Sequence, residues 1–141
     1  MKKVIYFVLV IPMLVGMMFS CSEVKTDAKK LDGKWTIVEV DGEKIVKEKM
    51  PYIEFKMAEK RLHGNGGCNM FNSSFTLDDK DASAISFAPA AATMMACLDM
   101  ETEGKIFKEF ENVNSVKAGK NDNEMLLVDK NNKLLFVLER Q

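Results

Sequence analysis

The stretch GNGGCNMFN, which runs from Gly64 to Asn72, carries the strongest structural signal in this chain of 141 residues. Three glycines and three asparagines surround one cysteine there, between two segments that read as strands. Glycine adopts positive backbone φ angles at little cost and is common at bulges, so this composition predicts a turn or bulge between paired strands. A second short stretch, TMMAC from Thr93 to Cys97, contains the other cysteine expected in the folded body.

Segments on both sides of the glycine stretch have the pattern of sheet strands. Residues 52–57 before it and 71–77 after it alternate apolar and polar side chains. Two continuous apolar runs, 125–128 and 134–138, are joined by a polar turn and predict a buried hairpin. In all, we expect about eight short strands in a strongly bent antiparallel sheet that forms a partial barrel.

One segment, near residues 99–111, has the spacing of an amphipathic helix and makes the fold class α+β. Asp99 is the expected N-cap, and acidic residues follow in the first turn, where they interact favourably with the helix dipole. Gly104 lies on the apolar stripe and is expected to permit close packing on the sheet. The stripe predicts core packing rather than a cofactor site, and its members are Met100, Ile106, Phe107 and Phe110. Trp35, near the start of the first strand, is likewise expected to be a core anchor.

The first 20 residues have the layout of a secretory signal peptide. Lys2 and Lys3 precede an almost unbroken apolar run, 4–15, which is shorter than the roughly 20 residues of a membrane span. The sequence Met18-Phe19-Ser20-Cys21 then resembles the cleavage site of bacterial lipoproteins. This resemblance implies a diacylglycerol on the Cys21 thiol and a fatty acyl group such as palmitate on the new N-terminus. The alternative is an ordinary secreted protein in which Cys21 is incidental.

These features divide the chain into a signal peptide (1–20), a flexible tether (21–30) and one domain (31–141). Ser22 rather than aspartate follows the lipidation site, which by analogy favours the outer membrane of a bacterial cell envelope. The formal net charge of −1 and the lack of a long basic run argue against nucleic-acid binding and against electrostatic attachment to lipid. The expected membrane contact is therefore the lipid on Cys21, and the body is expected to be monomeric.

Candidate catalytic and metal-binding residues are few. Cys68 and His63, the only histidine, offer a thiol and a base, which nucleophilic catalysis requires. A zinc site needs three or four ligands, and Cys68, Cys97 and His63 lack the usual ligand spacing. The glycine stretch lacks the lysine and the following helix of a phosphate-binding loop. The sequence therefore predicts no catalytic residue, no metal and no cofactor, with the Cys68–His63 pair as the alternative.

The two cysteines of the body are best interpreted as structural. If Cys21 carries lipid, Cys68 and Cys97 remain as an even pair in a compartment that permits disulfides. Closing a loop of about 30 residues would contribute about 3 kcal/mol to stability, and strain would reduce it. A disulfide is the favoured interpretation, and two buried free thiols are the alternative.

Together these motifs resemble the META domain family, also called HslJ-like lipoproteins, over the whole body from Leu31 to Leu138. The resemblance rests on a Leu-x-Gly-x-Trp start at residues 31–35, two cysteine motifs, two helix residues and the final apolar hairpin. Met94 departs from the family pattern because arginine is frequent there, and residues 73–75 depart because Gly-x-Tyr is frequent there. The motif residues are Gly67, Cys68, Asn69 and Phe71 in the first cysteine motif, Thr93, Met95, Ala96 and Cys97 in the second, and Glu103 and Phe107 on the helix.

The resemblance implies a small α+β domain that is frequent in bacterial envelope lipoproteins and is linked to stress and drug tolerance. It implies no established catalytic mechanism. We therefore expect a lipid-anchored, non-enzymatic envelope domain that binds a protein or a small apolar ligand in envelope maintenance or stress tolerance. Two alternatives stay open: a cysteine enzyme that uses Cys68 with His63, and a pilot or assembly-factor lipoprotein that escorts another envelope protein.

Overall fold

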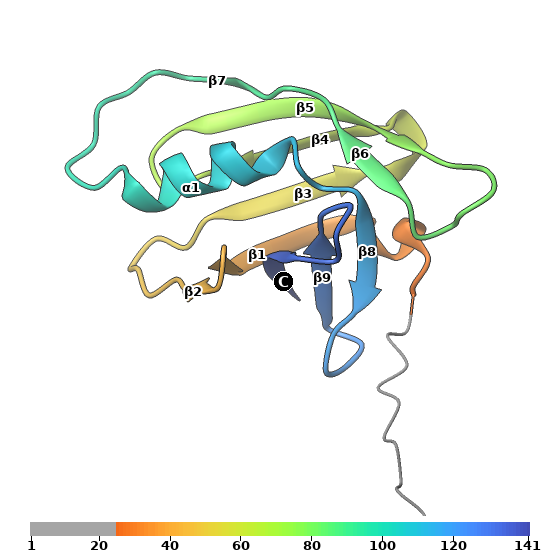
Figure 1. The fold of residues 1–141 in the computed structure, drawn as a ribbon. Helices are drawn as coiled ribbons and strands as arrows, with labels where there is room; N and C mark the ends of the chain where they lie inside the picture. The colour runs from red at the N-terminus through yellow and green to blue at the C-terminus, as the bar shows by residue number, and fades with distance from the viewer. Residues whose placement is uncertain (1–24) are drawn as a thin grey trace, which may run out of the picture.

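The computed structural model describes residues 25–141, which form one α-helix, two 3-10 helices and ten strands (Figure 1). Most elements are short and follow one another closely, as the many turn signals in the sequence predict. In chain order they are η1 (Ala28–Leu31), β1 (Gly33–Val40), β2 (Glu43–Lys44), β3 (Tyr52–Lys56), η2 (Met57–Glu59), β4 (Arg61–Asn65), β5 (Met70–Leu77), β6 (Ile85–Phe87), β7 (Ala91–Ala92), α1 (Glu101–Phe110), β8 (Ser115–Ala118), β9 (Glu124–Val128) and β10 (Leu134–Arg140).

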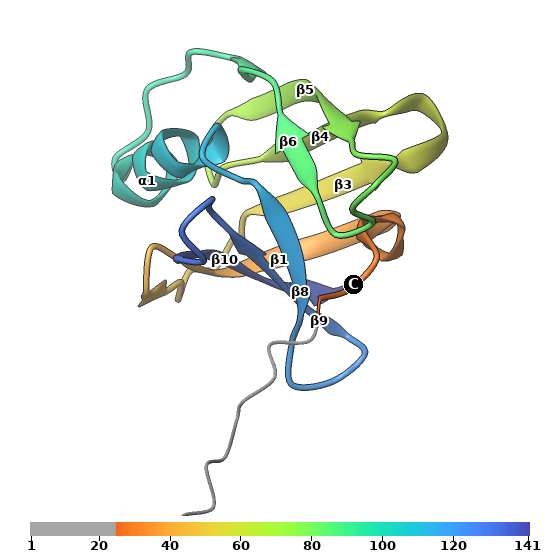
Figure 2. The same ribbon diagram turned by 45° about the vertical axis from the view of Figure 1, so that its right-hand side comes forward.

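The strands form one antiparallel sheet in the order β6-β5-β4-β3-β1-β10-β9-β8, with β2 paired to β1 and β7 paired to β5. The two ends of this sheet meet. The Ile85 N–H donates to the Asn114 carbonyl at 3.0 Å, and the Val116 N–H donates to the Ser83 carbonyl at 2.9 Å. These bonds nearly close the sheet into a barrel (Figure 2), which confirms the predicted α+β class with a strongly bent antiparallel sheet.

The interior of the barrel is filled by aliphatic and aromatic side chains, and α1 supplies part of this core. Ile106 and Phe110 are almost completely buried. The Phe110 ring lies 5.5 Å from that of Phe71 on β5 and 4.8 Å from that of Phe87 on β6. Offset and edge-to-face aromatic pairs at such distances stabilise a core beyond their buried area. The helix is therefore fixed to the sheet by its apolar side.

Trp35 is a core anchor, as predicted. Its side chain is completely buried, and its indole Nε1–H donates to the Leu31 carbonyl at 2.7 Å. The Arg140 guanidinium lies 4.3 Å from the centre of the indole ring, in a cation–π arrangement. The residue therefore joins the first strand to the 3-10 turn before it and to the last strand of the chain.

The helix differs from the prediction at its start and in the position of its buried face. It begins at Glu101 with Met100 as the N-cap residue, although the Asp99 carboxylate still accepts the Glu101 N–H at 3.1 Å. Gly104 faces solvent, and the predicted packing of this residue on the sheet is wrong. The face that turns inward contains Ile106 and Phe110, as predicted, and Glu103 in place of Gly104.

The packed chain also begins before Leu31, the predicted start of the domain. Ala28 is completely buried, and its N–H donates to the Ala82 carbonyl at 2.8 Å. The predicted signal peptide (1–20) and the lipidation site Cys21 lie outside the described residues. Within residues 25–141, no helix has the length and apolarity required to cross a membrane.

Candidate functional site

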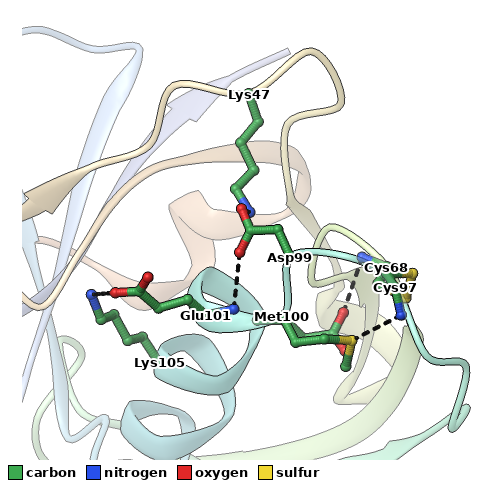
Figure 3. Close-up of polar contacts among 8 residues, drawn as sticks. Lys47, Cys68, Cys97, Asp99, Met100, Glu101 and Lys105 are labelled. Atoms are coloured by element: carbon green, nitrogen blue, oxygen red, sulfur yellow. Dashed lines mark hydrogen bonds and ion pairs between the residues drawn. A yellow bond between two sulfur atoms is a disulfide. The ribbon is translucent and has the colours of Figure 1, made fainter.

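The two cysteine motifs meet in a disulfide between Cys68 and Cys97, which confirms the favoured pairing (Figure 3). The two residues are 29 positions apart, and their Cα atoms are separated by 6.1 Å, a spacing that suits a disulfide. Cys68, which follows the last glycine of the Gly64–Asn72 stretch, is buried, whereas Cys97 lies in the exposed segment before α1. The bond therefore ties a segment without regular secondary structure to the sheet.

The side-chain amide of Asn69 connects the same two segments by hydrogen bonds. Its Oδ1 accepts the Met95 N–H at 2.7 Å, and its Nδ2 donates to the Met95 carbonyl at 3.1 Å. The Asn69 Oδ1 also accepts the Thr93 hydroxyl at 2.8 Å, and the Thr93 hydroxyl oxygen accepts the Met70 N–H at 3.1 Å. The Asn69 amide thus bonds both the N–H and the carbonyl of Met95, as the backbone of a neighbouring strand would. It takes the place of strand pairing at this residue, which lies after the end of β7.

Glu103 is the buried centre of this site, with only 3% of its surface exposed. Its Oε2 accepts the Cys68 N–H at 3.0 Å and the Asn69 N–H at 2.6 Å, and its Oε1 accepts the Asn69 Nδ2–H at 2.6 Å. A buried carboxylate is costly unless hydrogen bonds compensate for the lost water. Here three N–H groups do so, and each of them belongs to the first cysteine motif.

The glycines of the opening stretch make room for this carboxylate. A Cβ atom on Gly66 would lie 2.8 Å from Cγ and 2.9 Å from Oε2 of Glu103, closer than real Cβ contacts. Gly67 has φ +116°, a conformation that favours glycine. The Asn65 side chain completes the turn by accepting the Gly67 N–H at 2.7 Å. The predicted positive φ is therefore present, and a close approach to Glu103 adds a second requirement for glycine.

The start of α1 is also tied to the β2–β3 connection by ion pairs at the surface (Figure 3). The Lys47 Nζ lies 2.7 Å from Asp99 Oδ2, and this hydrogen bond is the main reason that the pKa of Asp99 is lowered. The Lys105 ammonium contacts both Glu43 and Glu101, which raises the pKa of Lys105 above its ordinary value. These exposed pairs contribute little energy individually, but they orient the segment that follows the disulfide.

His63 and Cys68, the alternative catalytic pair, have other partners in the structure. Cys68 has no thiol because its sulfur is bonded to Cys97. His63 is half-buried on β4, and its Nε2 lies 3.0 Å from the Glu54 Oε2 on the neighbouring strand. Among residues 25–141, no three His, Cys, Asp or Glu side chains form a cluster able to hold a metal ion.

The segment that the disulfide fastens presents apolar side chains to solvent. All residues from 91 to 100 are exposed. Met94 is 97% exposed, Leu98 is fully exposed, and Met95 is 55% exposed. Met70, whose backbone pairs with Thr93, is 51% exposed on the adjoining strand. We call Met70, Met94, Met95 and Leu98 the methionine surface.

Glu103 is the functional residue whose role the sequence did not predict. An acidic residue in the first turn of a helix is typical of dipole stabilisation at the surface, and the sequence alone predicts this role for Glu103. The useful signal was its spacing, because Glu103 is three residues before Ile106 and seven before Phe110, on one helix face. The methionine surface gave no signal, because apolar residues in an irregular segment have no periodicity to interpret.

The fold and the site define a class of small α+β barrels in which a disulfide and a buried carboxylate fasten the segment before the α-helix. The chain belongs to the META domain family, whose family model matches residues 28–141. No curated protein matches the chain.

Two solved structures have a similar fold. One is the NMR structure of a protein from Burkholderia xenovorans, with a TM-score of 0.66 and 19% identity, covering 93% of this chain and 99% of that chain. The other is the crystal structure of a DUF4847 family protein from Bacteroides vulgatus, with a TM-score of 0.54 and 15% identity, covering 79% of this chain and 94% of that chain. At these identities the likeness concerns the fold alone.

Replacement of the buried carboxylate tests its role in holding the site. In Glu103→Gln, the side chain keeps its size, but its NH2 group must face either the backbone N–H groups of Cys68 and Asn69 or the Asn69 amide. We expect the free energy of unfolding to fall by about 2–3 kcal/mol, the cost of losing hydrogen bonds to a charged acceptor. Urea denaturation followed by circular dichroism measures this change.

The matched control is Glu101→Gln, which removes a charge from the exposed side of the same helix turn. Its expected effect is below about 0.5 kcal/mol, as for other exposed pairs. Equal effects of the two substitutions would show that the loss reflects helix charge and not the buried hydrogen bonds.

The disulfide gives a second prediction. Because the Asn69 bonds hold the same segment, Cys68→Ser with Cys97→Ser should leave a folded domain whose free energy of unfolding is lower by about 3 kcal/mol, the loop-closure contribution. Mass spectrometry of the native protein after alkylation should find neither cysteine labelled until a reductant is added. A labelled Cys68 in unreduced native protein would contradict the structural role and favour the enzyme alternative.

Proposed function

We propose that this protein is a non-enzymatic, lipid-anchored domain of the bacterial cell envelope, which binds a partner protein through the methionine surface. The observation that carries this proposal is the exposure of Met94, Met95 and Leu98 together on a segment that is fastened at both ends. Exposed apolar clusters of this kind mark interaction sites in soluble domains. The role in envelope maintenance or stress tolerance is the one that the family resemblance implies.

The chemistry of the methionine surface suits an apolar segment of a protein. Methionine side chains are unbranched and polarizable, so they adapt to partners of irregular shape. The disulfide and the Asn69 bonds hold the backbone beneath them, so binding orders few backbone torsions and its entropic cost is small. Met94, which stands where arginine is frequent in the family, makes this surface more apolar than the family pattern does.

The position of the methionine surface favours a protein over the bilayer as its partner. The described chain starts at Lys25, four residues after Cys21, and an extended segment of that length spans about 14 Å. In Figures 1 and 2 the start of the described chain and the β7–α1 segment lie at opposite ends of the domain. A lipid on Cys21 would therefore hold the methionine surface away from the membrane.

The lipid anchor is tested by substitution of the modified cysteine. In cells grown with radioactive palmitate, the wild-type protein should incorporate label and Cys21→Ser should not, because the acyltransferases act on the lipidated cysteine. The double variant with Cys68→Ser and Cys97→Ser is the control, and it should incorporate label as the wild type does. Unlabelled wild-type protein that begins near residue 21 would show an ordinary secreted protein.

The partner is tested by photo-crosslinking in living cells. A benzoylphenylalanine at position 94 should give a discrete protein adduct, and the same probe at Thr76, an exposed position on β5, should not. Leu98→Asp places a charge in the binding surface without touching the core, so it should abolish the adduct from position 94.

Three outcomes would overturn the proposal: adducts with lipid only, adducts that persist with Leu98→Asp, or equal adducts from Thr76. If the crosslinked protein also leaves the membrane in a strain that lacks this chain, the binding role is that of an assembly factor. If the crosslinked protein stays in the membrane, this chain binds it but is not required to deliver it there.

A further inference from the structure

A second surface feature, distinct from the methionine surface, is a cleft of about 590 Å³ on the outside of the barrel. Its floor is formed by four partly buried aliphatic side chains on adjoining strands, namely Val38, Leu126, Leu134 and Val137. The chain from Lys44 to Val46 forms one wall, and Gly119 and Lys120 of the β8–β9 turn form the other. The volume is in the range of clefts that bind small organic ligands.

The cleft also contains two carboxylates in an unfavourable arrangement. Glu124 on β9 and Glu139 on β10 are directly opposite in the antiparallel register. Like charges at directly opposite positions destabilise a sheet. None of the ion pairs among residues 25–141 includes either carboxylate, although the Glu124 Oε1 accepts the Lys120 N–H at 3.0 Å. Glu39, the third acid of the cleft, is in register with Lys44. The lining contains three acids and two lysines, so the cleft has an excess of one negative charge beside the aliphatic floor.

We propose that this cleft binds an amphipathic cation, a molecule that joins an aliphatic or aromatic body to an ammonium group. The body would cover Val38, Leu126 and Val137, and the ammonium would lie by Glu124 and Glu139. Binding removes apolar surface from water and relieves the repulsion between the two carboxylates. Neutral apolar molecules would gain only the burial of apolar surface. Anionic amphiphiles would in addition be repelled by the two carboxylates.

This binding does not depend on the partner protein proposed above, because the residues of the cleft and of the methionine surface do not overlap. The cleft extends from the β2 segment to the β8–β9 turn, and in Figure 1 this turn lies on the same lower side of the domain as the start of the described chain. An anchored domain would thus present this cleft to molecules at or near the membrane.

The experiment uses the mature chain with Cys21→Ser, which lacks only the lipid, and two probes below their micelle concentrations. Decyltrimethylammonium and decyl sulfate share a ten-carbon chain and differ in the charge of the head group. We expect saturable shifts of the Leu126, Val137 and Ile45 amides in NMR spectra with the cation. The affinity for decyl sulfate should be at least about tenfold lower, because the two carboxylates then repel the head group.

Substitutions in the cleft distinguish the contribution of the carboxylates to binding from that of the aliphatic floor. Glu124→Gln with Glu139→Gln should weaken binding of the cation about tenfold and should raise the midpoint of urea unfolding, because the repulsion is removed. Val137→Lys should abolish binding of the cationic probe, because its ammonium occupies the floor and repels the head group. The charge-matched control, Glu48→Gln with Glu59→Gln, changes exposed acids outside the cleft and should leave the affinity unchanged.

Three results would overturn the inference. Equal affinity for the cationic and the anionic probe would show that charge plays no part. Unchanged affinity in the Glu124→Gln, Glu139→Gln variant would exclude these two carboxylates as the cation site. Shifts confined to the amides of Met94, Met95 and Leu98 would assign the binding to the methionine surface and leave the proposed protein partner untouched.

Discussion

The carboxylate of Glu103 holds together parts of the chain that the sheet alone would leave separate. On the buried face of α1, where water is excluded, it accepts hydrogen bonds from three N–H groups of Cys68 and Asn69. Every buried side-chain nitrogen and oxygen in residues 25–141 has a hydrogen-bond partner, so this polar centre leaves no such group without compensation. A fully satisfied buried network fixes one arrangement, because any shift of the helix would break several short bonds at once.

As a consequence of this network, the segment before α1 has a fixed backbone and exposed apolar side chains. Asn69 pairs with the backbone of Met95, and the disulfide fixes Cys97 two residues further along. Met94, directly before Met95, and Leu98, directly after Cys97, are exposed to solvent. A segment without regular secondary structure would normally be among the least stable parts of a domain. Here covalent and buried polar bonds make it a defined surface.

Much of the fold followed from local patterns in the sequence. The alternation in β3 and β5 and the apolar runs of β9 and β10 gave the sheet, and the spacing of Ile106, Phe107 and Phe110 gave the helix. The pairing of Cys68 with Cys97 followed from the cysteine count and was supported by two motifs. Gly104 is exposed because successive residues of a helix are about 100° apart, so the neighbour of the buried Glu103 faces another direction.

By itself, the sequence determined the α+β class, the cysteine pair and the family, because periodicity, glycine-rich turns and motif spacing are local properties of the chain. Only the tertiary structure decided that Glu103 is a buried acceptor, that the methionine surface is exposed and that Glu124 faces Glu139. Each of these three features depends on which residues far apart in the sequence become neighbours in the folded chain. Solvent exclusion at Glu103 and strand register at the glutamates are set by long-range packing, and the helical spacing of Glu103 indicates only the face on which it lies.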